Sequence, residues 1–355
     1  MSEIKVNSIV DASGGSTVQV NGYTPTMSNM AGRNRIINGD MRIDQRNNGA
    51  AVTASGSYPI DRFNVNNTSD GGFSAQQSST VPAGFSKSLG ITITASDSSL
   101  TGTQRLVLRQ TIEGYNIADF NWGTSDAKTV TLSFKVRSSV TGTFSGSLRN
   151  SAGDRSYPFT YSISSANIWT DISVTIAGET TGSWNITNGE GILVFFSLGV
   201  GPDLQGTAGA WASGNYWGAS GETQLVNTNG ATFYITGVQL EAGSVATPFE
   251  HVDYSEMLRR CQRYCHAYSS YSLGRARDAD TVYGGGVAIS PTMRAIPTLR
   301  SGATFTVNTG STGTPQIYSP SGGASSPDSV YLNNASANWT TNALIALTGI
   351  FEAEL

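Results

Sequence analysis

The sequence has few charged residues and no excess of positive charge. Lys, Arg, Asp and Glu make up 13% of the 355 residues, about half of the roughly 25% that is usual in soluble domains. The formal net charge is −4, whereas proteins that depend on nucleic-acid phosphates carry a basic surface. Nucleic acid is therefore not expected as a partner.

Long apolar runs are also missing. The longest, residues 191–200, is much shorter than the roughly 20 residues that span a bilayer as a helix. Residues 1–10 alternate polar and apolar side chains, unlike the hydrophobic region of a secretory signal. We expect a soluble protein that is made in a cytoplasm and does not insert into a membrane.

Histidine and cysteine are too scarce for most metal or nucleophile chemistry. The two histidines, His251 and His266, do not lie in a metal-binding motif. Cys261 and Cys265, with His266 alongside, do not supply the usual four zinc ligands. We expect buried small side chains here, no metal and no cofactor. A disulfide between Cys261 and its copy across a symmetry axis stays open.

Paired carboxylates are the catalytic arrangement that the sequence leaves open. Glycosidases use two Asp or Glu side chains, which come from distant segments. Asp40, Asp44, Glu113 and Asp119 are candidates in that general sense. No glycine-rich run ends in the Gly-Lys-Ser or Gly-Lys-Thr of a phosphate-binding loop. We expect no enzyme, with a polysaccharide depolymerase as the alternative.

What the chain does have is glycine, with 41 residues, and many short segments of alternating polar and apolar side chains. Between residues 31 and 250 these segments are rich in β-branched and aromatic residues and end in turn-forming clusters. They predict eight or nine antiparallel strands, packed as a two-sheet jelly roll. The predicted strands are residues 36–43, 88–95, 105–110, 129–138, 143–150, 157–163, 171–177, 191–198 and 232–240.

Residues 231–250 close this domain. Phe233, Ile235, Val238 and Leu240 alternate with polar residues, and the phase slips once at Gly237. A single slip of this kind predicts a strand with a β-bulge. Turn-forming residues follow, so we place a domain boundary at residue 250.

Residues 1–30 form short alternating stretches around Ile4, Val6, Ile9 and Val10. They are too few and too polar to bury a core of their own. We interpret them as an attachment arm, with a disordered tail as the alternative.

Arginines cluster just after this arm, at Arg33, Arg35, Arg42 and Arg46. The guanidinium group pairs well with carboxylates and amides, which suits a subunit or partner interface. We assign Arg33 and Arg35 to virion attachment. Scattered surface ion pairs are the alternative.

A helix is predicted from residue 253 to 268, within a linking segment at residues 251–270. Asp253, with Glu256 three residues later, has the pattern of a helix N-cap. Apolar residues follow at spacings of three and four, at Leu258, Cys261, Cys265 and Tyr268. This apolar stripe has to pack either on its own domain or on copies of itself. The second case predicts a trimer seam.

Residues 271–355 return to strand patterns and predict a smaller second β-sandwich. The predicted strands are residues 282–289, 296–307, 330–332 and 344–354. The whole chain is thus expected to be mainly β, with a jelly roll, one helix and a C-terminal sandwich.

Five aromatic residues lie on predicted turns or in the long segment 199–230. Flat rings can stack on the C–H face of a sugar, while neighbouring polar groups bond its hydroxyls. Glycan contact and burial against the sandwich or a neighbouring subunit both remain open. The five residues are Trp122, Trp184, Trp211, Tyr216 and Trp217.

Several motifs resemble those of tailed-phage virion proteins, a group that includes tail-fibre, minor tail and carbohydrate-binding proteins. They are GRNRIINGDMRIDQRNNG (32–49), YPIDRF (58–63), RQTIEGYNIADFNWGTSDAKTVTLSFKVRSSVTGTF (109–144), SYPFTYSIS (156–164), ITGVQLEAGSVATPFE (235–250) and CQRYC (261–265). The N-terminal IKVNSIVDASGGS also resembles the start of phage fibre proteins. The resemblance implies a virion protein that is commonly trimeric.

The central domain is similar to galactose-binding-like carbohydrate modules. In such modules acidic residues of the closing strand often hold a structural calcium ion. Thr236 and Gly237 stand at that place here, which puts the calcium in doubt.

These observations predict a trimeric tail fibre or appendage that attaches by its arm to other virion proteins and binds host-surface glycan. A capsid or neck decoration protein is the first alternative and a depolymerase the second. In each case the protein is expected in the virion.

Overall fold

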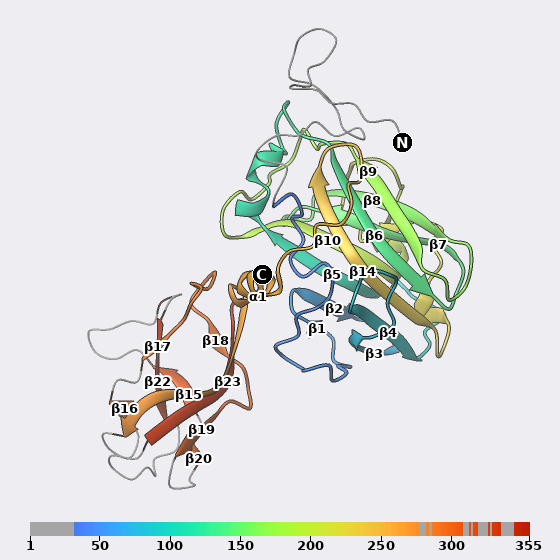
Figure 1. The fold of residues 1–355 in the computed structure, drawn as a ribbon. Coiled ribbons are helices and arrows are strands. Elements are labelled where there is room, and N and C mark those ends of the chain that lie inside the picture. Colours follow the sequence, from blue (N-terminus) through green and yellow to red (C-terminus); the bar gives the residue numbers. More distant parts are fainter. Residues whose placement is uncertain are drawn as a thin grey trace, which may run out of the picture.

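The computed structural model describes residues 32–276, 282–283, 286–307, 312–313, 315–318, 326, 329–334 and 344–355. These residues form a large β-sandwich and a smaller C-terminal β lobe, with α1 (Tyr254–Gln262) between them (Figure 1). The mainly β fold that the sequence predicts is confirmed. Ile4, Val6, Ile9 and Val10 lie outside the described residues.

The large sandwich consists of a seven-stranded and a five-stranded sheet, in which each strand pairs antiparallel with its neighbours. The first sheet has the order β1 (Ser57–Ile60), β2 (Phe63–Asn67), β5 (Arg105–Glu113), β10 (Glu190–Val200), β7 (Gly142–Arg149), β8 (Arg155–Ile163) and β12 (Ala212–Ser213). The second has the order β3 (Gly72–Ser78), β4 (Ser88–Ala95), β14 (Thr232–Ala242), β6 (Val130–Ser138) and β9 (Thr170–Ile176). This non-sequential strand order is that of a jelly-roll sandwich.

Short elements complete this domain. A parallel pair, β11 (Gln205–Gly206) and β13 (Gly218–Ala219), lies in the long segment before β14. The 3-10 helices are η1 (Gly114–Asn116), η2 (Ala118–Phe120), η3 (Pro202–Leu204) and η4 (Leu225–Asn227). No helix of the described residues has the length and apolar character needed to cross a membrane.

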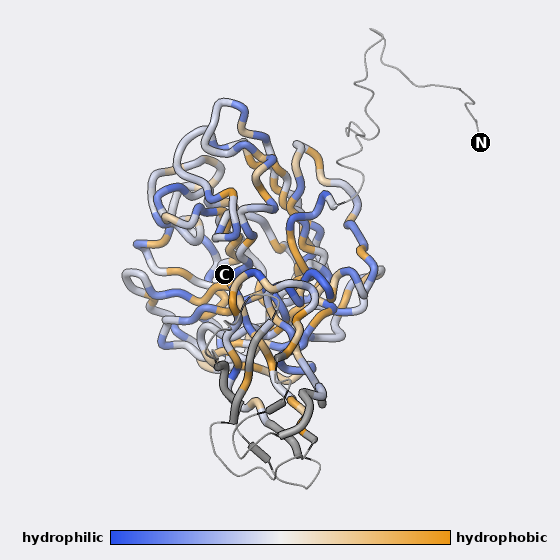
Figure 2. Tube along the Cα trace, turned by 90° about the vertical axis from the view of Figure 1, so that its left-hand side faces the viewer, coloured by the Kyte–Doolittle hydropathy of each residue, from blue (hydrophilic) through white to orange (hydrophobic). Residues whose placement is uncertain are grey.

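The core lies between the two sheets because every second residue of a strand points to the same face. On β10, Val194 and Phe196 belong to this core, while Leu193 and Phe195 belong to a separate cluster on the opposite face. Phe134 of β6 meets Phe196 edge-on, with ring centroids 5.0 Å apart, and so joins the two sheets. Apolar residues run through the inside of the sandwich and hydrophilic ones gather in its loops (Figure 2).

The closing strand has the predicted bulge. The register of β14 against β6 shifts between Thr236 and Gln239, and Gly237 has a φ of +63°. The Val238 amide donates to the Gly39 carbonyl at 2.9 Å. A Cβ at Gly39 would collide with the Val238 carbonyl oxygen, so glycine is required for this close approach.

The predicted strand at residues 36–43 is wrong. Asn38 and Met41 have positive φ angles of +63° and +61°, which are incompatible with a strand. The Asn38 side chain donates to the Ile43 carbonyl and accepts from the Ile43 amide, both at 2.9 Å. The segment is therefore a loop. The Asn38 side chain forms the hydrogen bonds with Ile43 that a neighbouring strand would form in a sheet.

The predicted helix is too long. The Asp253 carboxylate accepts from the Ser255 amide at 2.8 Å and begins α1, but the helix ends at Gln262. Cys265 and Tyr268 lie on β15 (Cys265–Ala276) and pair with β23 (Leu344–Glu352). A strand partner about eighty residues further along the sequence thus overrides the local helical pattern.

The apolar side of α1 is covered by its own chain. Met257 and Cys261 are buried against Ile43, and Leu258 packs partly against the same cluster. Both Cys261 and Cys265 are buried free thiols, and burial raises their pKa values well above the usual range.

The described residues of the C-terminal lobe form two sheets. One has the order β16 (Val282–Tyr283), β15, β23, β19 (Thr304–Val307) and β20 (Thr312–Gly313), with β18 (Thr298–Leu299) also paired to β23. The other has the order β17 (Gly286–Ala288), β22 (Ser329–Asn334) and β21 (Pro315–Tyr318). The predicted strand 296–307 is thus divided into two, and the described parts of 282–289 belong to different sheets.

A buried ionic network joins the lobe to the sandwich. The Arg46 guanidinium lies 3.1 Å from Asp61, 2.7 Å from Glu352 and 2.8 Å from Glu354. Glu354 also pairs with Arg62. Arg46, predicted as part of an interface cluster, therefore forms an interface within the chain.

Candidate functional site

The outer face of the seven-stranded sheet carries a second set of buried side chains. Val107 on β5 and Leu193 and Phe195 on β10 point away from the main core and form a cluster with Leu204 and Trp217. The last two come from the long segment between β10 and β14. This segment therefore folds back over the sheet.

Glu222 fastens the segment to the sheet. Its carboxylate accepts from Ser145 Oγ, from Ser197 Oγ at 2.7 Å and from the Val200 amide at 3.1 Å. Burial raises its pKa to about 7, although these three hydrogen bonds favour the charged form.

Trp217 lies on the sheet next to two arginines. Its ring stacks on Phe195, with centroids 4.3 Å apart and an interplanar angle of 28°. The indole N–H donates to Asn215 Oδ1 at 2.7 Å. The guanidinium carbons of Arg105 and Arg149 lie 4.4 Å and 5.2 Å from the Trp217 ring centroid.

Arg105, Arg109 and Arg149 share this face. We call these three arginines and Trp217 the arginine face. Arg105 and Arg109 are four residues apart on β5, so both point to the side of Val107. Arg149 on β7 lies opposite Leu193, and its guanidinium carbon is 5.4 Å from the Phe195 ring centroid.

The three guanidinium groups have no carboxylate partner. Within the part of the chain that the structure describes, none of them lies within 4.0 Å of a carboxylate oxygen. The Nε atoms of Arg109 and Arg149 are buried and have no hydrogen-bond partner among the described residues. Only 9% of the Arg149 surface is exposed. Such an arrangement is costly unless another group satisfies it.

Their mutual repulsion appears in the pKa values. Burial, together with the charges of Arg109 and Arg105, lowers the pKa of Arg149 to about 10, and Glu190 opposes this only in part. Burial and Arg109 also lower the pKa of Arg105. Three guanidinium groups without a carboxylate partner among the described residues give the face a local excess of positive charge.

Polar groups of β2 border the arginine face. Asn64 lies opposite Arg109 in the β2–β5 register, and Asn66 lies opposite Val107. Arg105 Nε donates to Asn66 Oδ1 at 2.6 Å. The Asn66 side chain is half-buried, so its amide lies at the edge of the face.

The five predicted sugar-binding aromatics do not form one site. Trp122, Trp184 and Trp211 meet edge-on, with centroids 4.8 to 5.5 Å apart. Tyr157 joins them 5.3 Å from Trp211. Trp122 and Trp184 are buried, with 6% and 8% exposure, and Trp211 is half-buried.

Trp217 and Tyr216 lie apart from that cluster. Trp217 is buried against Phe195 of the sheet, whereas Tyr216 is half-buried and packs on Gly206 and Gly214. Of the five, only Trp211 and Tyr216 keep substantial exposed surface. Glycan contact by these rings stays a prediction.

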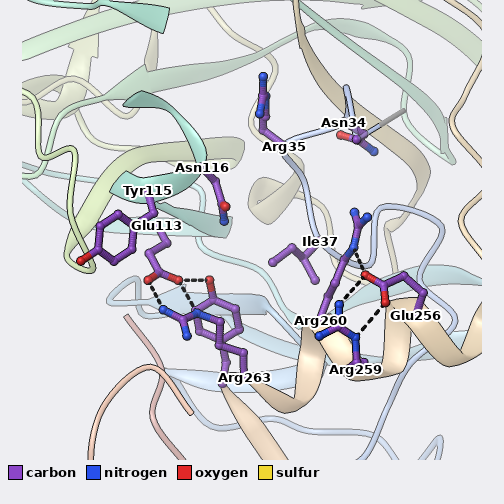
Figure 3. Close-up of a pocket in the computed structure, with 12 residues that line it drawn as sticks. Asn34, Arg35, Ile37, Glu113, Tyr115, Asn116, Glu256, Arg259, Arg260 and Arg263 are labelled. Carbon is purple, nitrogen blue, oxygen red and sulfur yellow. Dashed lines mark hydrogen bonds and ion pairs between the residues drawn. The ribbon is translucent and has the colours of Figure 1, made fainter. Parts of the chain in front are cut away.

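A second candidate is a cavity of about 400 Å³ between residues 32–37, η1 and α1. Figure 3 shows that Glu113 and Glu256 are each paired with arginines of α1 or of the residues that follow it, whereas Arg35 is paired with Asp119 outside the cavity. Glu256 accepts from Arg259 and Arg260 at 2.8 and 3.0 Å, and Glu113 accepts from Arg263 at 2.5 and 2.9 Å. Because each of these arginines has a carboxylate partner, the cavity has less need of a charged ligand than the arginine face.

Glu113 is not set up as a proton donor. Burial raises its pKa, but hydrogen bonds from Arg263 and Tyr264 outweigh burial, and the net pKa is lowered. A glycosidase acid needs a raised pKa. The other three candidate carboxylates are also engaged, Asp40 by Arg42, Asp44 by the Asn47 amide and Asp119 by Arg35.

The predicted attachment arginines are used within the chain. Arg33 donates to Thr247 Oγ1 at 2.8 Å and to the Pro248 carbonyl at 2.7 Å, and Arg35 pairs with Asp119 at 2.8 Å. Their role in virion attachment stays a prediction.

At the expected calcium position Thr236 donates its hydroxyl to the Lys87 carbonyl. Across the described ranges, no group of three or more His, Cys, Asp or Glu side chains is arranged to hold a metal ion.

Sequence reasoning missed the arginine face. The spacing of Arg105 and Arg109 within a predicted strand could have placed those two on one side. Arg149 could not have been added, because the β7–β10 pairing that brings it there is not visible in the sequence.

The sequence matches no protein-family model and no curated protein. Among solved structures it resembles the enzymatically active domain of tailspike protein 4 of bacteriophage CBA120, with a TM-score of 0.31 and 12% identity over 59% of this chain. The chain spans only 22% of that tailspike domain.

Carbohydrate-binding modules are further structural neighbours. The family 11 module of cellulosomal cellulase Lic26A-Cel5E of Clostridium thermocellum has a TM-score of 0.27 and 11% identity, over 58% of this chain and 99% of the module. TmCBM61, solved with β-1,4-galactotriose, has a TM-score of 0.28 and 9% identity, over 59% and 99%. At such low TM-scores the likeness does not bear on what this chain binds, which has to follow from its own residues.

Proposed function

We propose that this protein binds glycan on the outer face of its seven-stranded sheet. The observation that carries the proposal is the row of three guanidinium groups on that face without a carboxylate partner. Sugars present many oxygen acceptors on a flat surface, and an arginine can donate to two of them at once.

Further features of the face support this proposal. Asn66 adds a half-buried amide group along one edge, and Tyr216 offers a half-exposed ring on the segment that folds over the sheet. Strands hold the arginines in place, which suits a preformed binding surface. The motif resemblance to carbohydrate-binding phage proteins favours the same class of ligand.

The experiment is binding of the purified full chain to a panel of bacterial surface polysaccharides, measured by biolayer interferometry. We expect one class of polysaccharide to bind, and the Arg109→Gln variant to lose at least about tenfold in affinity. Arg137→Gln is the matched control. Arg137 also lies on a strand and stacks on a ring, with its guanidinium carbon 5.3 Å from the Tyr234 centroid, but on the other sheet.

Failure of every polysaccharide to bind would refute the proposal. Equal losses in the two variants would place the binding surface elsewhere. Release of reducing ends during the assay would instead favour the depolymerase alternative.

We further propose that the protein is a trimeric appendage of a phage virion, on the strength of the motif resemblance. Labelling of intact particles distinguishes the two structural roles, because a few copies at the tail indicate a fibre and many copies over the head indicate capsid decoration. The trimer is tested by light scattering of the native chain and of variants of α1. Leu258→Asp also disturbs the packing of Leu258 against the cluster that contains Ile43 within the chain, so Tyr254→Asp, at a position that is 52% exposed, is the milder probe. A variant that stays trimeric would show that α1 is not the trimer seam.

A further inference from the structure

The arginine face concentrates positive charge on a protein that has little of it. The net charge of the chain is −4, yet three guanidinium groups lie together on β5 and β7 with no carboxylate partner in the described residues. Like charges that are brought together in a partly buried place repel one another and disfavour their own charged forms. An arrangement of this kind becomes favourable when an anion binds between the charges.

The other arginines of the described sandwich provide the contrast. Arg35, Arg46 and Arg155 are each paired with a carboxylate, at 2.8, 2.7 and 2.7 Å. All the other arginines of the described sandwich except Arg137 have an acidic partner within 4.0 Å. Arg105, Arg109 and Arg149 are the three that lack such a partner and lie together on one face.

The hydrogen-bond donors of the three guanidinium groups are only partly used by described residues. Arg149 is nine-tenths buried and bonds Asn215 through Nη1, while its Nε has no partner. Arg105 bonds Asn66 and the Thr103 carbonyl. Arg109 is half-buried and has no side-chain hydrogen bond to any described residue.

We propose that the glycan bound here is acidic, and that its carboxylate or phosphate group lies against Arg109 between Arg105 and Arg149. This inference rests on the proposed function and adds the chemical class of the ligand. Carboxylate and phosphate oxygens match the two-pronged geometry of a guanidinium group. A neutral sugar would leave the repulsion between the three charges uncompensated.

The test uses the intact chain and matched pairs of polymers. Polygalacturonate, polysialic acid and polyglycerol phosphate are the acidic probes, and carboxyl-reduced forms of the first two are the neutral counterparts. We expect at least one acidic probe to bind about tenfold or more tightly than its neutral form, with an affinity that falls as salt is raised. Binding of the carboxylate polymers or of polyglycerol phosphate identifies which anion is recognised.

Variants link this preference to the face. Arg109→Gln removes the half-buried charge and should abolish the preference for the acidic probe, whereas Arg137→Gln should leave it unchanged. Arg109→Lys keeps the charge but loses the planar fork, so it should retain only part of the affinity. Circular dichroism and thermal melts show whether each variant is folded, and Arg105→Gln is the replacement if Arg109→Gln does not fold.

The outcomes separate the two proposals. Equal binding of acidic and neutral forms, or an acid preference that survives Arg109→Gln, overturns this inference and leaves the proposed function intact. Binding of no glycan of either kind overturns both. Equally tight, salt-sensitive binding of a single-stranded oligonucleotide overturns the assignment to glycan, because the face would then recognise any polyanion.

Discussion

Glu222 should make the stability of the protein depend on pH between about 4.5 and 7. Its carboxyl group is buried between Ser145, Ser197 and the Val200 amide, where it ties the segment carrying Trp217 to the sheet. Burial raises its pKa from 4.5 to about 7. The test is to measure unfolding at pH 5 and pH 8, in the native protein and in Glu222→Gln.

The direction follows from the protons that each state binds. Between the two pKa values the folded state keeps a proton on Glu222 that the unfolded state has lost, so raising the pH favours unfolding. The stabilising contribution is fully present below pH 4.5 and is lost as the pH rises through about 7. A shift of this size corresponds to about 3 kcal/mol, since the group is almost completely buried.

The assay is urea denaturation followed by tryptophan fluorescence and circular dichroism. The native protein should be about 2.5 kcal/mol less stable at pH 8 than at pH 5 from this group alone, because part of the change has already occurred at pH 5. Asp61, whose pKa burial raises to about 6, adds a change in the same direction. The side chain in Glu222→Gln stays neutral, so this variant should lack the part of the pH dependence that comes from Glu222. The difference between the two proteins measures that part.

An equal pH dependence in the native protein and in Glu222→Gln would refute this reasoning. It would mean that Glu222 titrates with the same pKa in the folded and unfolded states. Glu190→Gln serves as the control, because Glu190 is half-buried and lies on the same sheet.

Three further substitutions test the packing. Gly39→Ala should cost about 1–3 kcal/mol, measured by thermal unfolding, because its Cβ meets the Val238 carbonyl. Trp211→Ala should lose about 2–4 kcal/mol through its edge contacts with three other rings, and an unchanged melting temperature would contradict the cluster. Arg46→Met should cost about 3–5 kcal/mol, because it leaves the buried Asp61 without its cation. Faster proteolysis between the lobes would report that loss.

Much of the strand content could be predicted from local alternation. The strand at residues 88–95 agrees in full with β4, and the other predicted strands of the sandwich that formed agree with β5 to β10 and β14 within three residues. The bulge at Gly237 was also visible as a slip in phase. Alternation predicts strands because adjacent side chains of a strand must point to opposite faces.

Weakly patterned strands could not be found in this way. The segment containing β1, β2 and β3 is rich in Asn, Ser and Gly, and these residues have a low intrinsic preference for strands. They form strands because their neighbours pair with them. β2, for example, lies against β5 over residues Phe63 to Asn67.

The end of the helix and the candidate site depended even more on distant partners. Residues 263–268 continue the helical spacing, yet Cys265 begins a strand because β23 lies beside it. Arg149 joins Arg105 and Arg109 only because β7 and β5 both pair with β10. No property of one segment alone predicts these neighbours.

The amino-acid sequence by itself determined that the protein is built from strands, where most of them run, and that aromatic rings lie in one long segment. Tertiary structure decided that three of the five rings are buried and that unpaired arginines occupy the sheet face instead. The reason is that side-chain direction along a strand is a local property with a period of two. Which charges meet is set by strand pairing between segments that are tens of residues apart.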